Sequence, residues 1–261
     1  MKILCIGDVC GHTGCEVVEE HLRKIKNENK IDLCIVNGEN SADGNGILPK
    51  SALRLFDAGA DVITGGNHTL QRREIYDELD SNPYLLRPAN YPESTFGKGY
   101  CVVDFGKYRV AVVNISGLVY LDSLDSPFST ADRIIEKLHG DGIKNIIVDF
   151  HAEVTSEKRA FGFYLDGRVS AVYGTHTHIP TADADVLPNG TGYITDIGMC
   201  GSKHSVLGVK KEIIVSRFVT KIPERFVIED EPPFIINGCI FEIDENTGKC
   251  FNAELLTKEF N

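Results

Sequence analysis

The sequence lacks an excess of positive charge and has no apolar run long enough to cross a membrane. Its 261 residues include 27 Lys and Arg against 38 Asp and Glu, which gives a formal net charge of −11. Because sequence-nonspecific nucleic-acid binders and peripheral membrane proteins normally present basic surfaces, we expect no membrane partner and no stably bound duplex nucleic acid. The N-terminus has too few apolar residues for a signal peptide, so we expect a cytoplasmic protein.

Cysteine pairs of the C-x-x-C type, low-complexity linkers and internal repeats are also missing. The eight cysteines make up about 3% of the chain, far below the density of disulfide-stapled secreted domains. Several of them lie in apolar runs, where a free thiol behaves as a small buried hydrophobic group. These absences favour reduced cysteines, disfavour a structural zinc knuckle, and predict one domain spanning residues 1–261.

Short apolar runs alternate with amphipathic segments along the chain, which predicts an α/β protein. We expect strands over residues 2–6, 32–36, 61–64, 145–149 and 169–173. Helices are expected over residues 14–27, 49–58, 72–79, 129–138 and 156–161. Residues 99–115 read as a hairpin that turns at 106–107. Further β runs at 184–187, 192–195, 234–243 and 250–256 predict an antiparallel second sheet or sheet edge.

Polar clusters follow five of the expected strands at their carboxyl ends. Their sequences are GD, NGEN, GGNH, DFH and GTHTH. In an open α/β sheet the carboxyl ends of parallel strands meet at one rim, so these clusters are expected to converge. The candidate site residues among them are two carboxylates, two carboxamides and four imidazoles: Asp8, Glu39, Asn40, Asn67, His68, His151, His176 and His178.

This set of side chains predicts a metal site with two ions rather than one. A single catalytic zinc needs three protein ligands and a water, fewer than the donors available here. A mixed oxygen and nitrogen shell suits iron, manganese, zinc, cobalt or nickel, and it argues against iron–sulfur clusters and closed structural zinc. The alternating histidines of GTHTH project to the same side of an extended segment, which suits a metal better than a core.

The ordered series of motifs resembles the calcineurin-like metallophosphoesterase superfamily, and more closely its YmdB-like bacterial phosphodiesterase branch. The resemblance implies a four-layer α/β/β/α sandwich with two mixed β-sheets. It also implies the following site: Asp8, Asn40 and His178 on one metal, Asn67, His151 and His176 on the other, Glu39 bridging, and His68 as a catalytic residue that is not a ligand. The chain departs from the superfamily's usual motifs at Cys10, where a histidine is common, and at Glu39-Asn40, where the usual motif ends in Asp.

The activity implied by the resemblance is hydrolysis of small phosphodiesters, with 2′,3′-cyclic nucleotides preferred over 3′,5′-cyclic ones. A hydroxide bridging two metal ions would attack phosphorus in line, and His68 would protonate the leaving group. Iron is the expected metal, with manganese or zinc as alternatives. A phosphomonoesterase or nuclease with the same centre, or a regulatory metal- or nucleotide-binding protein with incidental turnover, are the alternative interpretations. Homo-oligomerisation stays open.

A few residues outside the clusters are weaker candidates. His12 and His204 are candidates for lining a pocket, whereas His21 and His139 are expected on the surface of helices. Arg72-Arg73 is a candidate phosphate-facing pair, although a solvated first helical turn is the favoured interpretation. The loops at 114–129 and 199–207 are expected to shape the substrate pocket.

Overall fold

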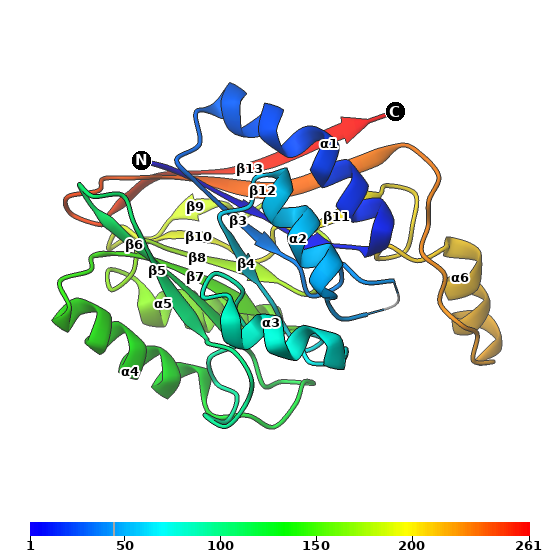
Figure 1. The fold of residues 1–261 in the computed structure, drawn as a ribbon, viewed down its shortest axis with the longest axis horizontal. Helices are drawn as coiled ribbons and strands as arrows, with labels where there is room; N and C mark the ends of the chain where they lie inside the picture. The colour runs from blue at the N-terminus through cyan, green and yellow to red at the C-terminus, as the bar shows by residue number, and fades with distance from the viewer. Residues whose placement is uncertain (44) are drawn as a thin grey trace.

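Two mixed β-sheets pack face to face between helices in the computed structural model, which describes residues 1–43 and 45–261 (Figure 1). The first sheet contains, in spatial order, β2 (Asp8–Val9), β11 (Met199–Ser202), β12 (Phe234–Ile243), β1 (Lys2–Ile6), β3 (Leu33–Asn37) and β4 (Val62–Thr64), and β13 (Cys250–Phe260) pairs with β12. The second contains β5 (Tyr100–Asp104), β6 (Arg109–Ser116), β7 (Asn145–His151), β8 (Ala171–Thr175), β10 (Gly192–Ile194) and β9 (Asp185–Val186).

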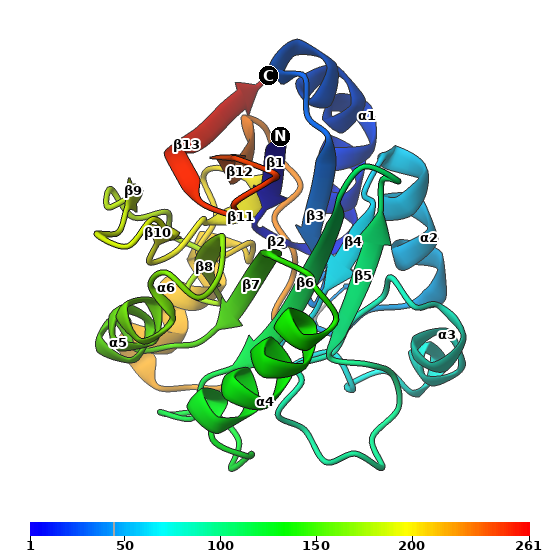
Figure 2. The ribbon, with the colours of Figure 1, turned by 90° about the vertical axis from the view of Figure 1, so that its left-hand side faces the viewer.

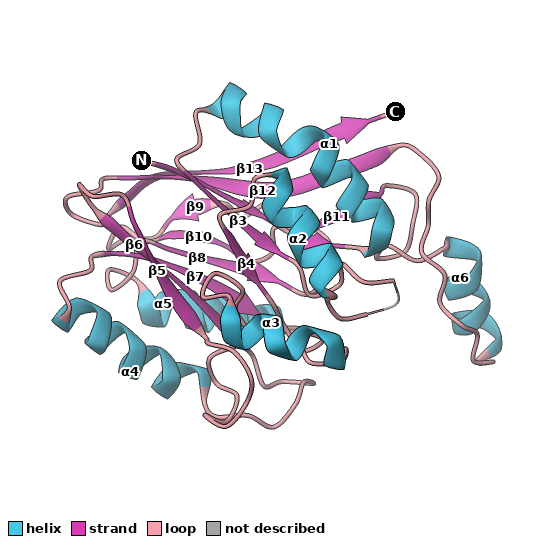
Figure 3. Ribbon diagram, viewed as in Figure 1, coloured by secondary structure: helices cyan, strands magenta, loops and turns pink. Residues whose placement is uncertain are grey.

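Helices cover the outer face of each sheet (Figure 3). The first sheet is covered by α1 (Gly11–Asn29), α2 (Pro49–Ala58) and a 3₁₀ turn (Arg73–Ile75) leading into α3 (Tyr76–Ser81), and the second by α4 (Pro127–Gly140) and α5 (Thr155–Leu165). A further helix, α6 (Lys211–Thr220), covers neither sheet. Among these described helices, none combines the length and the apolar character needed to cross a membrane.

The strands alternate their side chains between two hydrophobic layers, as a pleated strand must. In β1, Ile3 and Cys5 enter the core between the sheets, whereas Leu4 and Ile6 pack under α1 and α2. The second sheet contributes to the same central core and buries its other face against α4 and α5. Figure 2 shows the resulting order of helices, sheet, sheet and helices. The predicted four-layer α/β/β/α sandwich with two mixed sheets is therefore confirmed.

Most predicted elements are present, and the hairpin forms between β5 and β6. All eight cysteines, which lie within the described residues, are free and buried. Of the two alternatives for the C-terminal β runs, a sheet of their own is wrong and an antiparallel sheet edge is confirmed. β12 enters the first sheet beside β1 and pairs with β13, and β9 and β10 extend the second sheet beside β8. Helix α6 was not expected at all, and it projects from the body of the molecule (Figure 1).

The parallel strands in each sheet bring their carboxyl ends to a common edge. β1, β3 and β4 are mutually parallel neighbours in the first sheet, and β6, β7 and β8 are parallel neighbours in the second. The polar clusters therefore come from two sheets rather than from one open sheet, and they meet where the two carboxyl edges lie together.

Candidate metal centre

All eight predicted site residues follow strand ends at this shared edge. Asp8 starts β2, and Glu39 and Asn40 come after β3. Asn67 and His68 follow β4, His151 ends β7, and His176 and His178 follow β8. The side chains of Asp8, Glu39 and His151 are fully buried, which is costly for ionisable groups unless they are paired or bind a cation.

One group of donors converges on His151. Its Nε2 lies 2.9 Å from Oδ1 of Asn67, 3.0 Å from Nδ1 of His176 and 3.2 Å from Oε1 of Glu39. Ligand atoms of Glu39, His151 and His176 all lie within 4.8 Å of one another. Four potential ligand atoms thus face one small volume.

A second group lies around His178. Its Nε2 is 3.3 Å from Nδ2 of Asn40 and 3.7 Å from Oδ1 of Asp8. The buried Oδ1 of Asp8 has no hydrogen-bond partner among the described residues, although Oδ2 accepts a bond from the backbone N–H of His176. Asn40 Nδ2 also donates to Oε1 of Glu39 at 3.0 Å, so Glu39 contacts both groups. A 180° rotation of the Asn40 carboxamide would present its oxygen to a cation here.

The outer nitrogen of each of the three histidines has its own partner. Nδ1 of His151 lies 2.8 Å from Oγ1 of Thr175, Nε2 of His176 lies 3.0 Å from a carboxylate oxygen of Glu153, and Nδ1 of His178 lies 3.2 Å from the carbonyl of Leu207. When these outer nitrogens carry the protons, the inner ones direct lone pairs into the site. Such outer partners are the usual support of metal-binding histidines.

The electrostatics of the buried groups also fit a bound cation. Burial lowers the pKa of His151, but the adjacent Glu39 carboxylate outweighs it and raises that pKa to about 9. Burial and the neighbouring His151 lower the pKa of His176 to about 3. Burial tends to raise the pKa of Glu39, yet His151 and His68 hold it well below its usual value. The buried Glu39 carboxylate therefore stays ionised and attracts positive charge to the centre.

Gly66 leaves the space that this centre needs. A Cβ atom at this position would overlap Oε2 of Glu39 and Nε2 of His151. The glycine thus keeps the chain after β4 close to the donor atoms without filling the space between them. Buried donors, an orphaned carboxylate oxygen and this clearance together fit a metal centre.

His68 lies at the open side of the centre. Its backbone N–H donates to Oε2 of Glu39 at 2.9 Å, and its Nδ1 is 2.9 Å from Oδ1 of Asn40. The side chain is 33% exposed, in contrast to the buried His151. Since Nδ1 is engaged within the site, Nε2 is the nitrogen able to meet a ligand from solvent.

A cavity of about 500 Å³ opens over the centre. Glu39, Asn40, His68, His176 and His178 line one side, and Cys10 lies beneath His178 with its Sγ 3.5 Å from Nδ1. Of the two loops expected to shape the pocket, 199–207 contributes Val206 and Leu207, whereas 114–129 contributes no lining residue. The remaining wall comes from α6 and from residues 226–228, which the sequence did not indicate.

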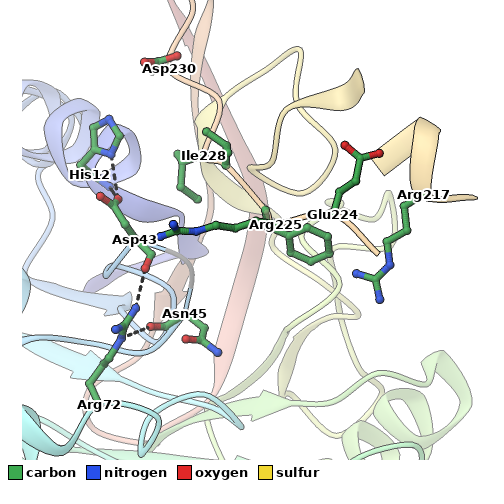
Figure 4. A pocket seen from close by; sticks show the side chains of 11 residues that line it. His12, Asp43, Asn45, Arg72, Arg217, Glu224, Arg225, Ile228 and Asp230 are labelled. Atoms are coloured by element: carbon green, nitrogen blue, oxygen red, sulfur yellow. Dashed lines mark hydrogen bonds and ion pairs between the residues drawn. The ribbon is translucent and has the colours of Figure 1, made fainter. Parts of the chain in front are cut away.

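The weaker candidates lie away from the donors. His12 is exposed, with its Nδ1 2.9 Å from a carboxylate oxygen of Asp43, and it lines an adjacent cavity of about 660 Å³ (Figure 4). The guanidinium of Arg72 donates hydrogen bonds to the backbone carbonyls of Asp43 and Asn45. It therefore stabilises this loop instead of facing a phosphate. His139 and His204 are exposed, and His21 is half-buried against Phe260.

A buried ion pair, which no local sequence pattern indicates, supports the histidine loop. Lys158 Nζ donates to Asp196 at 2.6 Å and to the carbonyl of Thr175 at 2.8 Å. Asp196 also accepts from the backbone N–H and the hydroxyl of Thr177. His176 and His178 on either side of Thr177 have φ values of 96° and 66°, which disfavour L-residues, so this loop needs such support.

The chain is similar to several known proteins along most of its length. The chain is 46% identical to the 2′,3′-cyclic-nucleotide 2′-phosphodiesterase of Bacillus subtilis, covering 97% of this chain and 96% of that protein. A crystal structure described as a novel phosphatase from Mycoplasma pneumoniae superposes with a TM-score of 0.92 at 35% identity, covering 99% of this chain and 93% of that one. A 5′-nucleotidase precursor from Thermus thermophilus shares the fold alone, with a TM-score of 0.59 at 11% identity over 100% of this chain and 54% of that one.

The fold is thus that of the metallophosphoesterases, a fold that implies divalent metal ions, and the chain is an enzyme. The model of one family, described as YmdB-like protein, matches residues 4–256, which include all five polar clusters. These clusters lie together at one sheet edge, and the family model matches nearly the whole chain. The chain therefore belongs to the YmdB-like family.

Proposed function

We propose that this enzyme hydrolyses small phosphodiesters at a dinuclear metal centre, and that it prefers 2′,3′-cyclic nucleotides over 3′,5′-cyclic ones. The observation that carries the proposal is the approach of Asn67, His176 and Glu39 to one nitrogen of His151, with Asp8, Asn40 and His178 alongside. The substrate preference is supported by the 46% identity to the Bacillus subtilis enzyme. We also propose that it works in the cytoplasm as one domain.

The proposed ligand sets follow the two groups of donors. Asn67, His151 and His176 hold one ion, and Asp8, Asn40 and His178 hold the other, with Glu39 shared because it contacts both groups. Ions bound in this way supply the nucleophile and neutralise charge on the phosphoryl oxygens. Iron suits the nitrogen and oxygen donors, with manganese or zinc as alternatives.

His68 is proposed as the acid for the leaving oxygen. Its Nδ1 is held beside the half-buried Asn40 and the buried Glu39, so Nε2 is oriented by both side chains while the ring stays open to the cavity. A positioned acid of this kind contributes roughly 10²- to 10⁴-fold to turnover. Its contribution should be largest for substrates with poor leaving groups.

A panel of substrates tests the proposal with the metal-loaded enzyme. It comprises 2′,3′-cyclic nucleotides, 3′,5′-cyclic nucleotides, phosphomonoesters and single-stranded RNA, assayed with wild type and Glu39→Gln while bound metal is quantified. We expect the 2′,3′-cyclic substrates to be hydrolysed fastest, and Glu39→Gln to lose metal and turnover together. Full metal content and turnover in Glu39→Gln would show that the shared role of Glu39 is wrong.

The same panel separates the alternatives. Faster turnover of monoesters or RNA would make the enzyme a phosphatase or a nuclease. Equal binding of cyclic nucleotide with and without metal, and no turnover, would indicate a regulatory binding protein. His68→Ala is compared with His139→Ala, an exposed histidine on α4, and unchanged rates on a poor leaving group would overturn the acid role.

A further inference from the structure

The cavity over the metal centre has two chemically different walls. The polar wall carries the donor residues, including His68 and His178. The opposite wall is apolar and comes from the segment 206–209, from α6 and from residues 226–228; its side chains include Val206, Leu207, Ile214, Phe218, Phe226 and Ile228. A ligand that fills the cavity must therefore combine an anionic end with an apolar body.

The aromatic part of this wall is exposed to solvent. Phe218 is 70% exposed and Phe226 is 41% exposed, whereas Ile214 on the same helix as Phe218 is buried. Helix α6 stands away from the two sheets, so the fold itself does not cover these rings (Figure 1). Exposed apolar area costs about 25 cal/mol per Å² relative to burial, so a ligand that covers both rings gains binding energy.

The charged groups around the wall do not form an anion site of their own. Arg217 places its guanidinium 5.0 Å from the centre of the Phe226 ring, and Lys221 Nζ lies 5.7 Å from that of Phe218. Both cations thus lie at the rings. The adjacent cavity drawn in Figure 4 has no excess of positive charge, because its three arginines are matched by three carboxylates: Arg72, Arg217 and Arg225 against Asp43, Glu224 and Asp230. The phosphate of a ligand therefore belongs at the metal centre, and its uncharged part belongs at the phenylalanines.

We propose that Phe218 and Phe226 form a nucleobase subsite, against which the base of the substrate stacks while its phosphodiester lies at the metal centre. The inference rests on the proposed function and specifies which part of the substrate the protein recognises. Stacking on aromatic rings accepts every base, because every base has a π-face. The subsite thus selects nucleotides over phosphodiesters without a base, and it discriminates only weakly among the bases.

The test compares two cyclic substrates that differ in the base. Adenosine 2′,3′-cyclic phosphate carries one, and glycerol 1,2-cyclic phosphate has the same strained ring without it. In the metal-loaded enzyme, Phe218→Ala and Phe226→Ala should raise KM for the adenosine substrate by roughly 5- to 100-fold, with little change in kcat. KM for the glycerol substrate should not change.

Val219→Ala is the matched control, because Val219 is 76% exposed on the same helix but does not line the cavity. It should leave both substrates unaffected. Equal effects of the phenylalanine variants on both substrates, or no effect of the double variant on either, would overturn the subsite.

Binding of adenosine 3′-monophosphate, measured by calorimetry, separates this proposal from the proposed function. If wild type hydrolyses no cyclic nucleotide but binding still weakens in Phe218→Ala, the proposed function fails and the subsite stands. If cyclic nucleotides are hydrolysed and binding is unchanged in both phenylalanine variants, the subsite fails alone. Light scattering adds a further arm: if Phe218→Ala dissociates an oligomer and affects both substrates equally, a second copy of the chain covers this wall and the subsite is wrong.

Discussion

The hydroxyl of Thr175 lies 2.8 Å from Nδ1 of His151. It also donates to a carboxylate oxygen of Asp149 at 2.7 Å, so a buried carboxylate fixes the orientation of the histidine through one hydroxyl. Thr175→Val removes this link and should weaken metal binding roughly 10- to 100-fold, as loss of such outer partners usually does. Metal titration followed by elemental analysis measures the effect.

Thr175→Ser is the control, because serine keeps the hydroxyl. We expect near-normal affinity in Thr175→Ser, and recovery of turnover by Thr175→Val when metal is in excess. Normal affinity in Thr175→Val would show that the hydroxyl does not position His151.

Gly66→Ala should abolish metal binding without unfolding the chain. The added methyl group would overlap atoms of Glu39 and His151 that face the centre. Gly140→Ala is the matched control, since a Cβ there meets nothing within 4 Å. Circular dichroism and metal content should show two folded proteins, of which only Gly140→Ala binds metal; a full metal complement in Gly66→Ala contradicts the prediction.

Lys158→Met should lower the free energy of unfolding by about 3–5 kcal/mol, because it leaves the carboxylate of Asp196 buried without its cation. The exposed pair of Lys203 and Glu259 gives the comparison, and Lys203→Met should cost about 0–1 kcal/mol. Urea unfolding measures both variants. Equal, small losses in the two would mean that the buried pair contributes no more than a surface pair.

Protonation of Asp183 should lower the stability of the folded enzyme in acid. Partial burial raises the pKa of its carboxyl, but hydrogen bonds from Thr181 and Thr195 outweigh this and hold that pKa below its usual value. A lowered pKa in the folded state stabilises the protein above the unfolded-state pKa of about 3.9, and this contribution is lost as the pH falls through the folded-state pKa.

Asp183→Asn should therefore be less stable than wild type at pH 6, and the difference should shrink as the pH approaches 3. Urea unfolding of both proteins across this range measures the difference. A constant difference between pH 6 and pH 3 would exclude titration of Asp183 as its source.

Local patterns were sufficient for the strands and helices that carry the candidate site. β1 and β3 are short runs of buried, mostly apolar residues, and a polar cluster comes at the end of each. Because the two strands are parallel, both clusters lie at the same edge of the sheet. The α/β class followed from the alternation of apolar runs and amphipathic segments, whereas the four-layer sandwich with two mixed sheets was implied by the family resemblance. That two sheets rather than one share the donors depends on contacts between distant segments, which a periodicity does not reveal.

Other features had no local signal. The sequence of α6 is rich in β-branched residues and is mostly exposed, so neither propensity nor a buried stripe marked it as a helix. Lys158 lies in the first turn of α5, where its sequence neighbours do not distinguish it from a surface lysine, and its partner Asp196 is 38 residues away. The place of β12 in the first sheet depends on its pairing with β1 and β11, which its own sequence does not indicate.

The position of β12 also sets the order in which the enzyme matures during synthesis. Asp8 lies on β2, which pairs with β11, and β11 in turn pairs with residues 234–236 of β12. A nascent chain that has reached residue 178 contains every proposed ligand. The strands β11 and β12, which support Asp8 on β2, have not yet been synthesised at that point. Since ribosomes add about 5–20 residues per second, the site waits several seconds for its last supporting strand. We therefore expect the proposed centre to bind metal only late in synthesis, when the chain is almost complete.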